Sequence, residues 1–412
     1  MQLYGNKNDG KHTGDRRPKS EEEFAAEQRA VDEAMRGSRS GKPKKSKKRK
    51  KKGSAVKKIL LAILIIAALA AAAWFIFVEF FTEAPEVAPE GRQDGKFTFL
   101  IVGLDKVGNN TDTIMVARFD TENDNINVVS LPRDTLINSE SSVKKINSVY
   151  PASINNGGDG YTALAAAVEK MLGFKVDHVV VIDLQAAAEI VDTIGGVEFD
   201  VPVNMNYDDP VQDLHIHINK GLQKLNGEQT VQVLRFRATY GMGDIDRIDV
   251  QQSLFRAMAS QIISLGNIPN IDELISIAEN RVVTYNTHTG KPLTGDNIRY
   301  FLKEFLDLSG EDIQFMKMPA LNYYCGEICK VSYVFPDIGA WVDMVNERIN
   351  PYDEKISYED LDMVTAMNGN FYYTTEPLRG GVTSFYLYSS YPNVADYGIL
   401  PYSSILTDEG DN

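Results

Sequence analysis

Apolar residues follow three patterns along this chain of 412 residues. Residues 59–78 are apolar without interruption, whereas residues 97–131 form short runs rich in β-branched side chains. From residue 161 onwards, apolar positions with helical spacing alternate with further short runs. A run of about 20 apolar residues is long enough to cross the hydrocarbon core of a membrane. The patterns therefore predict one transmembrane helix, at residues 59–81, followed by a globular part.

Three strands are predicted at the start of the globular part. The runs FTFLIVGL, TIMVARF and INVVSL begin at Phe97, Thr113 and Ile126, and the polar segment DTENDN between the last two is typical of a tight turn. A helix at residues 161–172, ended by Gly173, leads to a further strand, HVVVIDL. Strands that alternate with helices predict an α/β fold, in which a mixed central sheet is flanked by helices.

The alternation continues through the rest of the chain. A second helix, QAAAEIVDTI, ends at Gly195-Gly196, VEFDV and LHIHI predict short strands, and Asn226 is a candidate N-cap for GEQTVQVLRF. Residues 245–265 predict a long amphipathic helix, and IGAWVDMVNERI predicts a later one. Near the C-terminus, FYYTTEPLRGGVTSFYLYSSY predicts two aromatic strands about an Arg-Gly-Gly turn. We expect this small β-rich appendage to pack its tyrosines onto the main domain rather than to stack them on sugars.

The predicted organisation has five parts. The polar N-terminus is expected to be disordered apart from a helix near residues 21–35, and TEAPEVAPEGRQDG to form an extended linker. The parts are 1–58, a basic cytoplasmic tail; 59–81, the transmembrane helix; 82–95, the linker; 96–352, the main domain; and 353–412, the aromatic-rich C-terminal region.

The charges beside the apolar run predict its orientation. The segment GKPKKSKKRKKKGSAVKK, directly before the run, contains many Lys and Arg and no acidic residue. Basic flanks stay in the cytoplasm, so everything after Phe81 is expected outside, anchored at the cell membrane. A cleaved signal peptide would begin near residue 1 and have a shorter apolar core, so an uncleaved single-pass anchor is favoured. Contact of the basic cluster with anionic membrane lipid is favoured over a nuclear signal or a nucleic-acid tail.

The charge of the exported part argues against nucleic acid as a partner. The whole chain has a formal net charge of −14, yet its first 58 residues hold 19 basic and 8 acidic side chains. The remainder therefore holds 24 basic against 49 acidic side chains. A surface this acidic repels phosphate backbones.

Two cysteines, Cys325 and Cys329, lie in the exported part. A local disulfide is slightly favoured over two free thiols, because exported proteins meet oxidising conditions. A zinc site would need more ligands than this loop offers.

Carboxylates and arginines at the ends of predicted elements form the candidate site. Asp105 and Asp112 flank the first two strands, and Arg133 follows the third. The segment NGEQTVQVLRFRATYGMGDIDRIDVQQ adds three more arginines, Arg235, Arg237 and Arg247. Mg²⁺ takes oxygen ligands, typically one or two carboxylates with water and phosphate, and the planar guanidinium binds two phosphate oxygens at once. The set predicts a divalent cation that bridges a diphosphate.

Each of these residues also has an ordinary structural interpretation. An Asp after a strand is more often a cap or turn former, and Arg133 with Asp134 would also make a local ion pair. Only the pattern as a whole favours a site. His215 and His217, on one face of a predicted strand, are a weaker metal candidate, because no further ligands occur at metal-site spacing.

A series of motifs resembles one known family. GLD…TDTIMVARFD, VVSLPRDT, KINSVYP, LGFKVDHVVVIDL, IVDTIGGVEFDVP, LHIHINKGLQKLNGEQTVQVLRFR and GDIDRIDVQQ occur in this order. They resemble the LytR-CpsA-Psr family of bacterial envelope enzymes, strongly over about residues 97–265 and more loosely to about residue 352. The anchor and the exported domain match the layout of that family as well.

The resemblance implies a domain that binds a polyprenyl-pyrophosphate-linked glycopolymer, of the teichoic acid or capsular type. Such enzymes transfer the phosphoglycan to a hydroxyl of peptidoglycan and release polyprenyl phosphate. Carried over by motif, Asp105 and Asp112 are expected to bind Mg²⁺, with Mn²⁺ as an alternative, and Asp105 to help deprotonate the acceptor hydroxyl. The residues expected to bind the pyrophosphate are Arg133, Arg235, Arg237, Arg247 and Gln251. Taken alone, the apolar helices near Leu164–Leu172 and Ala186–Ile194 are expected to be ordinary core. The family's hydrophobic prenyl pocket implies that part of their surface lines a tunnel.

Three positions depart from the family pattern. Val107 and Asn110 stand where members commonly carry Arg beside the two Asp, and Val250 stands where another Arg follows the position of Arg247. Fewer guanidiniums leave three interpretations open: a phosphotransferase with weakened diphosphate binding, a non-catalytic lipid-glycan binding or regulatory protein, and a polyprenyl-pyrophosphate hydrolase. The complete Asp pair favours the first, a Mg-dependent phosphotransferase.

Overall fold

The chain divides into two compact units, Met1–Phe75 and Ile76–Asn412, and the second contains the sheet. The computed structural model describes residues 84–87, 90–105, 111–210, 214–236, 244–263, 271–321, 333–367, 370–380 and 399–408, together with Glu22, Ala25, Ala26 and Arg29. Those four N-terminal residues are helical, in the region where a helix is predicted. The predicted membrane segment lies outside the described residues. None of the helices that are described combines the length and apolar character needed to cross a membrane.

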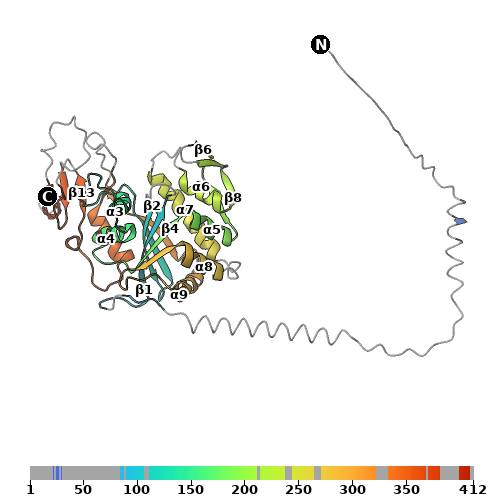
Figure 1. Ribbon diagram of the computed structural model, residues 1–412, viewed down its shortest axis with the longest axis horizontal. Coiled ribbons are helices and arrows are strands. Elements are labelled where there is room, and N and C mark those ends of the chain that lie inside the picture. The colour runs from blue at the N-terminus through green and yellow to red at the C-terminus, as the bar shows by residue number, and fades with distance from the viewer. Residues whose placement is uncertain are drawn as a thin grey trace, which may run out of the picture. The chain divides into compact units, whose positions relative to one another are not determined.

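A six-stranded mixed sheet forms the centre of the second unit (Figure 1). Its strands are β1 (Lys96–Leu104), β2 (Thr111–Asp120), β3 (Asn125–Ser130), β4 (His178–Asp183), β9 (Val283–Asn286) and β10 (Ile313–Lys317). Their order is β10-β3-β2-β1-β4-β9. The pairs β1–β2, β2–β3 and β4–β9 are antiparallel, whereas β1–β4 and β3–β10 are parallel. The predicted mixed sheet and its first four strands are confirmed.

The turn between β2 and β3 forms where DTENDN predicts it. Asp120 accepts a hydrogen bond from the backbone N–H of Asn123 at 3.0 Å. Asp124 has a φ of 50°, a left-handed conformation that Asp and Asn adopt more readily than most residues. This turn sets the register in which β2 and β3 pair.

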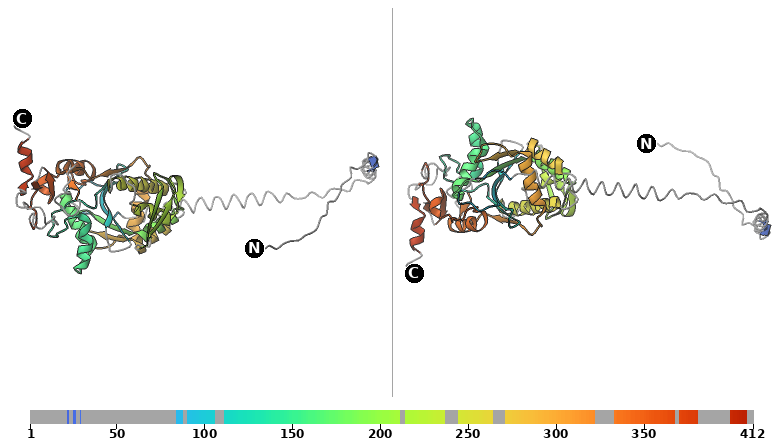
Figure 2. Two further views of the ribbon diagram at one scale, coloured as in Figure 1. Left: turned by 90° about the horizontal axis from the view of Figure 1, so that it is seen from above. Right: turned by 90° about the horizontal axis from the view of Figure 1, so that it is seen from below.

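Helices cover both faces of the sheet, so the unit has three layers (Figures 1 and 2). One face, which we call the α4 face, packs against α3 (Val149–Asn155), α4 (Gly160–Leu172) and α10 (Ile338–Met344). The opposite α7 face is covered by α7 (Asp244–Ile263) and α9 (Gly295–Leu306). Beside these two helices lie α5 (Leu184–Thr193), α6 (Gly227–Arg235) and α8 (Ile271–Arg281).

Capping residues fix where these helices begin and end. The Asp159 carboxylate accepts the backbone N–H groups of Tyr161 and Thr162, and α4 ends at Gly173, whose φ is 79°. Asn226 caps α6 in a reciprocal capping box with Gln229. Both predicted helix boundaries are therefore confirmed, and α7 begins and ends within two residues of its predicted range.

Two short antiparallel strand pairs extend the α7 side, and only the second is a hairpin of consecutive strands. They are β5 (Val197–Val201) with β8 (Gly221–Leu225), and β6 (Met205–Asp209) with β7 (Leu214–Ile218). Alternate residues of β5 and β7 are buried with Val233, Phe236 and Leu254 in a separate apolar cluster. The predicted strands VEFDV and LHIHI are thus confirmed, and they lie outside the central sheet.

The described part of the predicted linker is packed on the domain rather than extended away from it. The buried Arg92 guanidinium donates to the carboxylate of Asp177, and the backbone N–H of Gln93 donates to the carbonyl of Pro351 at 2.9 Å. The side-chain amide of Asn286 donates to the carbonyl of Glu86, also at 2.9 Å. Proline and charge suggested an exposed spacer, whereas a buried ion pair holds this segment in place.

The C-terminal region forms strands, but not the predicted hairpin. Its described elements are the 3-10 turn η4 (Tyr358–Asp360), β13 (Val364–Met367), β14 (Asn370–Tyr373), β15 (Ile399–Pro401) and α11 (Ser403–Asp408). Shortly before the region lie β11 (Ala320–Leu321), β12 (Phe335–Pro336) and a π-helical turn η3 (Val345–Ile349), and a 3-10 turn η1 (Ile146–Ser148) directly precedes α3. The aromatic strand β14 pairs with β13 on one side and β15 on the other, so neither of its edges is left for the predicted partner strand. That partner, at residues 382–391, lies outside the described residues.

Packing also continues across the predicted boundary at residue 352. Leu361 and Met363 are buried in the main core with α4, and Tyr372 is buried among the strands of the C-terminal sheet. The other predicted tyrosines, at 386, 388 and 391, and both cysteines lie outside the described residues. The C-terminal region is therefore continuous with the domain in its described part.

Candidate functional site

The two candidate metal-binding carboxylates lie at one end of the central strand pair. Asp105 follows the last residue of β1, and Asp112 is the second residue of β2. The strands are antiparallel, with Gly103 opposite Thr113, so the end of one meets the start of the other. A register shift after Gly103 marks this end of the pair. The predicted juxtaposition of Asp105 and Asp112 therefore follows from the register.

Two arginines contact Asp112 from different elements. Nη1 of Arg133, on the loop after β3, lies 2.9 Å from Oδ1 of Asp112. Nη2 of Arg247, on α7, donates to the backbone carbonyl of Asp112 at 3.3 Å, and its Nη1 lies 3.9 Å from Oδ1. Arg247 is only 3% exposed, so its charge is directed at this carboxylate and not into solvent. Three predicted residues thus form one electrostatic unit.

Asp134 and Lys145 extend this unit, and the second was not predicted. Nζ of Lys145 lies 3.0 Å from Oδ1 of Asp134, which is also 3.9 Å from Nε of Arg133. Asp134 therefore lies between two cations, and its contact with Arg133 is the local ion pair that the sequence also allowed. Lys145 belongs to the motif KINSVYP, and its proximity follows from a backbone bridge between Leu136 and Lys145 that the spacing alone does not reveal.

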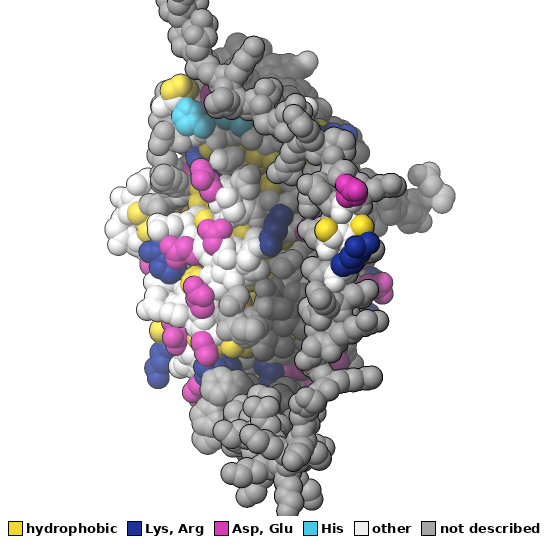
Figure 3. All heavy atoms as spheres, turned by 90° about the vertical axis from the view of Figure 1, so that its right-hand side faces the viewer, with side chains coloured by type: hydrophobic (Ala, Val, Ile, Leu, Met, Phe, Trp, Pro, Cys, Tyr) yellow, Lys and Arg dark blue, Asp and Glu magenta, His cyan; other side chains and the backbone are white. Residues whose placement is uncertain are grey.

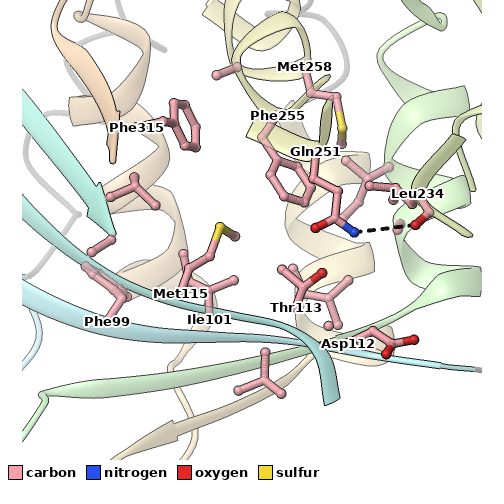
Figure 4. Close-up of a pocket in the computed structure, with 18 of the residues that line it drawn as sticks. Phe99, Ile101, Asp112, Thr113, Met115, Leu234, Gln251, Phe255, Met258 and Phe315 are labelled. Atoms are coloured by element: carbon pink, nitrogen blue, oxygen red, sulfur yellow. Dashed lines mark hydrogen bonds between the residues drawn. The ribbon is translucent and has the colours of Figure 1, made fainter. Parts of the chain in front are cut away.

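Arg235 and Gln251 complete the described part of the site. Arg235 is the last residue of α6, and Gln251 lies one turn after Arg247 on α7. The Gln251 amide donates to the carbonyl of Leu234 at 3.4 Å, which connects the two helices (Figure 4). Arg237 and the departing positions Val107 and Asn110 lie outside the described residues.

The third departing position, Val250, does not face the carboxylates. It packs against the apolar cluster beneath the strand pairs β5–β8 and β6–β7, with Leu254 and Phe199. Arg247 and Gln251, one helical turn apart, border the site instead. The valine therefore belongs to the packing of α7 in this chain.

An apolar cavity of about 380 Å³ opens beside these polar residues (Figure 4). Alternate side chains of β1 and β2 form its floor, including Phe99, Ile101 and Met115. The α7 residues Phe255 and Met258 cover it. Residues at its polar end are Asp105, Asp112, Asp183, Arg235 and Gln251. The cavity is thus amphipathic, with an apolar body and a mouth that carries the carboxylates and arginines.

Only one of the two helices predicted to line a tunnel does so. Leu184, Ala187 and Ile190 of α5 border the cavity. By contrast, Leu164 and Leu172 of α4 are fully buried in the core on the opposite face of the sheet. The favoured expectation of ordinary core is confirmed for α4, whereas α5 contributes part of its surface to the cavity; hydrophobicity alone does not show which face a helix covers.

The histidine pair is a surface feature away from the cavity. Nδ1 of His215 and Nε2 of His217 lie 2.6 and 3.3 Å from the same oxygen of Asp208. Both imidazoles are more than half exposed, and Figure 3 shows histidine side chains at one edge of that face of the molecule. Among the described residues, no group of three or more His, Cys, Asp or Glu is arranged to hold a metal ion. The weaker metal candidate gains no support.

Comparison with known proteins connects this arrangement to one family. The LytR_cpsA_psr family model matches residues 44–347. The chain is 28% identical over 198 residues to the polyisoprenyl-teichoic acid–peptidoglycan teichoic acid transferase TagV of Bacillus subtilis (strain 168). The aligned region covers 46% of this chain and 49% of TagV. The chain is 30% identical over 239 residues to the cell wall biosynthesis protein LcpA of Corynebacterium glutamicum. The aligned region covers 53% of this chain and 44% of LcpA.

The chain therefore spans about half the length of these curated relatives. The crystal structure of B. subtilis TagV superposes with a TM-score of 0.50 at 23% identity, over 62% of this chain and 97% of that one. This likeness shows a shared fold. Because the family match extends over most of the chain, from the basic N-terminal segment through the sheet and both halves of the site, the protein belongs to the LytR-CpsA-Psr family.

Proposed function

We propose that this protein is a glycopolymer–peptidoglycan ligase. It transfers a phosphoglycan, of the teichoic acid or capsular type, from a polyprenyl-pyrophosphate carrier to a hydroxyl of peptidoglycan and releases polyprenyl phosphate. One observation carries the proposal: an apolar cavity with Asp105, Asp112 and Arg235 at its polar end, where Arg133 and Arg247 contact Asp112. A ligand with a hydrocarbon tail and an anionic head matches both parts.

The body of the cavity suits a prenyl tail. Its lining from β1, β2, α5 and α7 is almost entirely apolar. Transfer of each CH₂ group from water to such a site contributes about 0.8 kcal/mol. Several isoprene units would bind there, and the diphosphate would remain at the mouth. The tail thereby holds the reacting group against the polar residues.

The arginines at the mouth supply charge for the diphosphate. Arg133 and Arg247 already converge on Asp112, and Arg235 borders the cavity from the opposite helix. Hydrogen bonds to charged groups contribute about 1.5–3 kcal/mol each, and arginine can bind two oxygens at once. The negative charge that develops on the departing polyprenyl phosphate would be stabilised by this set.

Asp105 and Asp112 fit a divalent cation that takes its other ligands from the substrate and water. Both carboxylates border one cavity mouth, and Mg²⁺ is commonly bound by one or two carboxylates together with phosphate oxygens. When bound, Mg²⁺ or Mn²⁺ would neutralise charge on the diphosphate. Arg133, at 2.9 Å from Asp112, orients that carboxylate.

The transfer itself breaks one phosphorus–oxygen bond. The acceptor hydroxyl oxygen attacks the phosphorus that carries the glycan, while its proton passes to Asp105. The bond from this phosphorus to the bridging oxygen breaks, and its electron pair leaves with polyprenyl phosphate. Arg133 and Arg247 face the leaving phosphate, and Asp134 and Lys145 hold Arg133 in place.

We also propose that the protein is a single-pass membrane protein with a cytoplasmic N-terminus and an extracellular domain. The basic segment before the apolar run supports this topology. Protease added to intact cells should cleave the exported domain and leave residues 1–58 protected. Protection of the region around Asp105 in intact cells, with cleavage after lysis, would show the opposite orientation and exclude a wall ligase.

The central test of function is Asp112→Asn. Removal of one charge from the proposed metal ligand should reduce Mg²⁺-dependent transfer about a hundredfold or more, because phosphoryl transfer relies on charge neutralisation. The measurement is release of polyprenyl phosphate from a lipid-linked glycan in the presence of peptidoglycan. The matched control is Asp208→Asn, an exposed carboxylate on β6 that contacts two histidines, His215 and His217. Full activity of Asp112→Asn would contradict the metal assignment.

The same assay separates the alternatives. Equal release without any glycan acceptor would identify a hydrolase, with water as the nucleophile. Tight lipid binding without release, in wild type and in Val107→Arg alike, would identify a binding or regulatory protein. Higher affinity or rate in Val107→Arg, which restores the arginine common in the family, would show an enzyme with a weakened diphosphate site.

A further inference from the structure

The loop after β3 has two arms that carry site residues. The first arm, residues 131–138, contains Arg133 and Asp134, and the return arm, residues 143–148, contains Lys145. Backbone hydrogen bonds join the arms, from Ile137 to Lys144 at 3.0 Å and from Ile146 to Thr135 at 3.0 Å. The position of the cations at the base of the loop therefore depends on how the two arms are held.

The C-terminal segment 361–380 holds the far end of the first arm. The amide nitrogen of Asn138 donates to Oδ1 of Asp362 at 2.8 Å and to the carbonyl of Glu376 at 3.0 Å. Its amide oxygen accepts the backbone N–H of Arg379 at 2.8 Å. Asn138 is only 6% exposed, so this side chain is buried with its amide satisfied by the C-terminal segment.

Arg379 donates hydrogen bonds to both Asn138 and Asp362. Its Nη1 donates to the backbone carbonyl of Asn138 at 2.9 Å, and its Nη2 donates to Oδ2 of Asp362 at 2.6 Å. Lys170, on α4, lies 3.3 Å from the same Asp362 oxygen. We call Asn138, Asp362 and Arg379 the clamp. It connects the first arm to a helix in the fully packed core.

The return arm is held by the same segment. Lys144 is fully buried, and its ammonium group donates to the carbonyls of Ser139, Ser141 and Arg379, the last at 2.8 Å. Burial lowers the pKa of Lys144. Leu136, also buried, packs with Leu378 and the aromatic residues of the C-terminal sheet. Both arms thus end on residues 361–380.

We propose that residues 361–367 and 370–380, the described part of this segment, are a positioning element of the diphosphate site. The clamp sets the backbone of the arms so that Arg133 reaches Asp112 at 2.9 Å and Lys145 reaches Asp134 at 3.0 Å. These residues lie beyond the range matched by the family model, which ends at residue 347. This role rests on the proposed function, because it concerns the binding of a diphosphate at the same site. A displacement of about 1 Å in such a group can cost about a hundredfold in rate.

The ordinary alternative is that the clamp only adds stability to the domain. Coupling with Arg133 distinguishes the two roles. If the clamp acts by positioning Arg133, loss of the clamp should change the diphosphate affinity little once Arg133 is absent. If it acts on stability alone, the two losses should be independent and their effects should add.

The test uses Arg379→Ala in the full chain, with Arg299→Ala as the matched control. Arg299 has two carboxylate partners, Asp272 and Asp296, and its side chain is 25% exposed against 28% for Arg379. The probe is farnesyl diphosphate with Mg²⁺, titrated by calorimetry. Arg379→Ala should bind it about tenfold more weakly than wild type, whereas Arg299→Ala should bind it normally. In an Arg133→Ala background, Arg379→Ala should add less than about twofold.

Amide hydrogen exchange gives a second readout that needs no ligand. In Arg379→Ala the amides of Leu136, Ile137 and Ile146 should exchange faster than in Arg299→Ala, because the arms lose their support. Arg379→Lys, which keeps a cation beside Asp362 but cannot reach both acceptors, should give a smaller effect in both measurements and serves if the alanine variant does not fold.

The outcomes separate the two proposals. Unchanged exchange in Arg379→Ala overturns the clamp. Faster exchange with normal farnesyl diphosphate affinity, or an affinity loss that adds fully to that of Arg133→Ala, overturns its positioning role. A wild-type chain that does not bind farnesyl diphosphate contradicts the proposed function, while the exchange measurement still decides whether the clamp holds the arms.

Discussion

Both faces of the central sheet are apolar and covered by helices, yet only the α7 face borders a large cavity. On the α4 face, Leu100 and Val102 of β1 are completely buried. On the α7 face, the neighbouring Phe99 and Ile101 are only partly buried, because they border the cavity. The same strand therefore contributes to a solid core on one side and to an apolar cavity on the other.

The packing on each face explains the difference. On the α4 face the indole of Trp341 is fully buried and donates to the carbonyl of Met171 at 2.6 Å, so the largest side chain of that layer is fixed. On the α7 face a space of about 380 Å³ remains between the sheet and α7. An unfilled apolar cavity costs on the order of 24 cal/mol per Å³ in mutant series of another protein. A space of this size is therefore expected to be kept for a ligand.

The largest difference between the faces should appear on truncation of neighbouring residues in β1. Leu100→Ala leaves a new hole in a close-packed layer and should lower the free energy of unfolding by about 3–5 kcal/mol. Ile101→Ala only enlarges an existing space and should cost about 1–2 kcal/mol. Urea denaturation of both variants measures the two costs. Equal losses would show that the α7 face is packed as tightly as the α4 face.

The free energy of unfolding at low pH should depend on His178, the first residue of β4. His178 is buried against Phe99 and Phe301, with ring centroids 5.1 and 5.6 Å away. Neither imidazole nitrogen makes a hydrogen bond to the described part of the chain. Burial lowers the pKa of His178 to about 4, with a smaller opposing effect from Asp177. The folded chain therefore favours the neutral ring over the protonated ring.

Between pH 6.5 and about 4 the unfolded chain binds a proton at this position that the folded chain does not. The free energy of unfolding therefore does not depend on the titration of His178 above pH 6.5, and it should fall as the pH decreases from 6.5 to about 4. The full difference amounts to about 3 kcal/mol. His178→Phe should remove this dependence, and should be more stable than wild type at pH 4.5 but not at pH 8. Parallel pH profiles for the two proteins would contradict the assignment.

Local sequence signals were sufficient for most of the sheet and for half of the site. The β-branched runs locate β1, β2 and β3, and Asp159 with Gly173 fixes α4, because these signals act within a few residues. Asp112 and Arg133 could be paired from the sequence, since the antiparallel register of neighbouring strands brings strand ends together.

Features that depend on distant parts of the chain could not be predicted in this way. Leu100 and Ile101 look alike in sequence, and only the placement of α7 shows which one faces a cavity. The clamp joins Asn138 to Arg379 across 241 positions, and no local pattern marks either residue. Arg92 looks like part of a polar linker, yet its partner Asp177 lies 85 positions away. Tertiary contacts decide all three cases.

The smallest expected effect tests whether the space on the α7 face holds the prenyl tail. Ala259 of α7 borders the cavity, and Ala259→Phe would place a ring inside it without displacing protein atoms. Its affinity for farnesyl diphosphate should fall about tenfold, or 1.4 kcal/mol, while that for inorganic pyrophosphate stays the same. The matched control is Ala165→Phe on α4, where the same ring has no space and should destabilise the fold by about 1–3 kcal/mol. If Ala259→Phe bound farnesyl diphosphate as tightly as wild type, the tail would lie elsewhere, and the two faces would differ in packing but not in function.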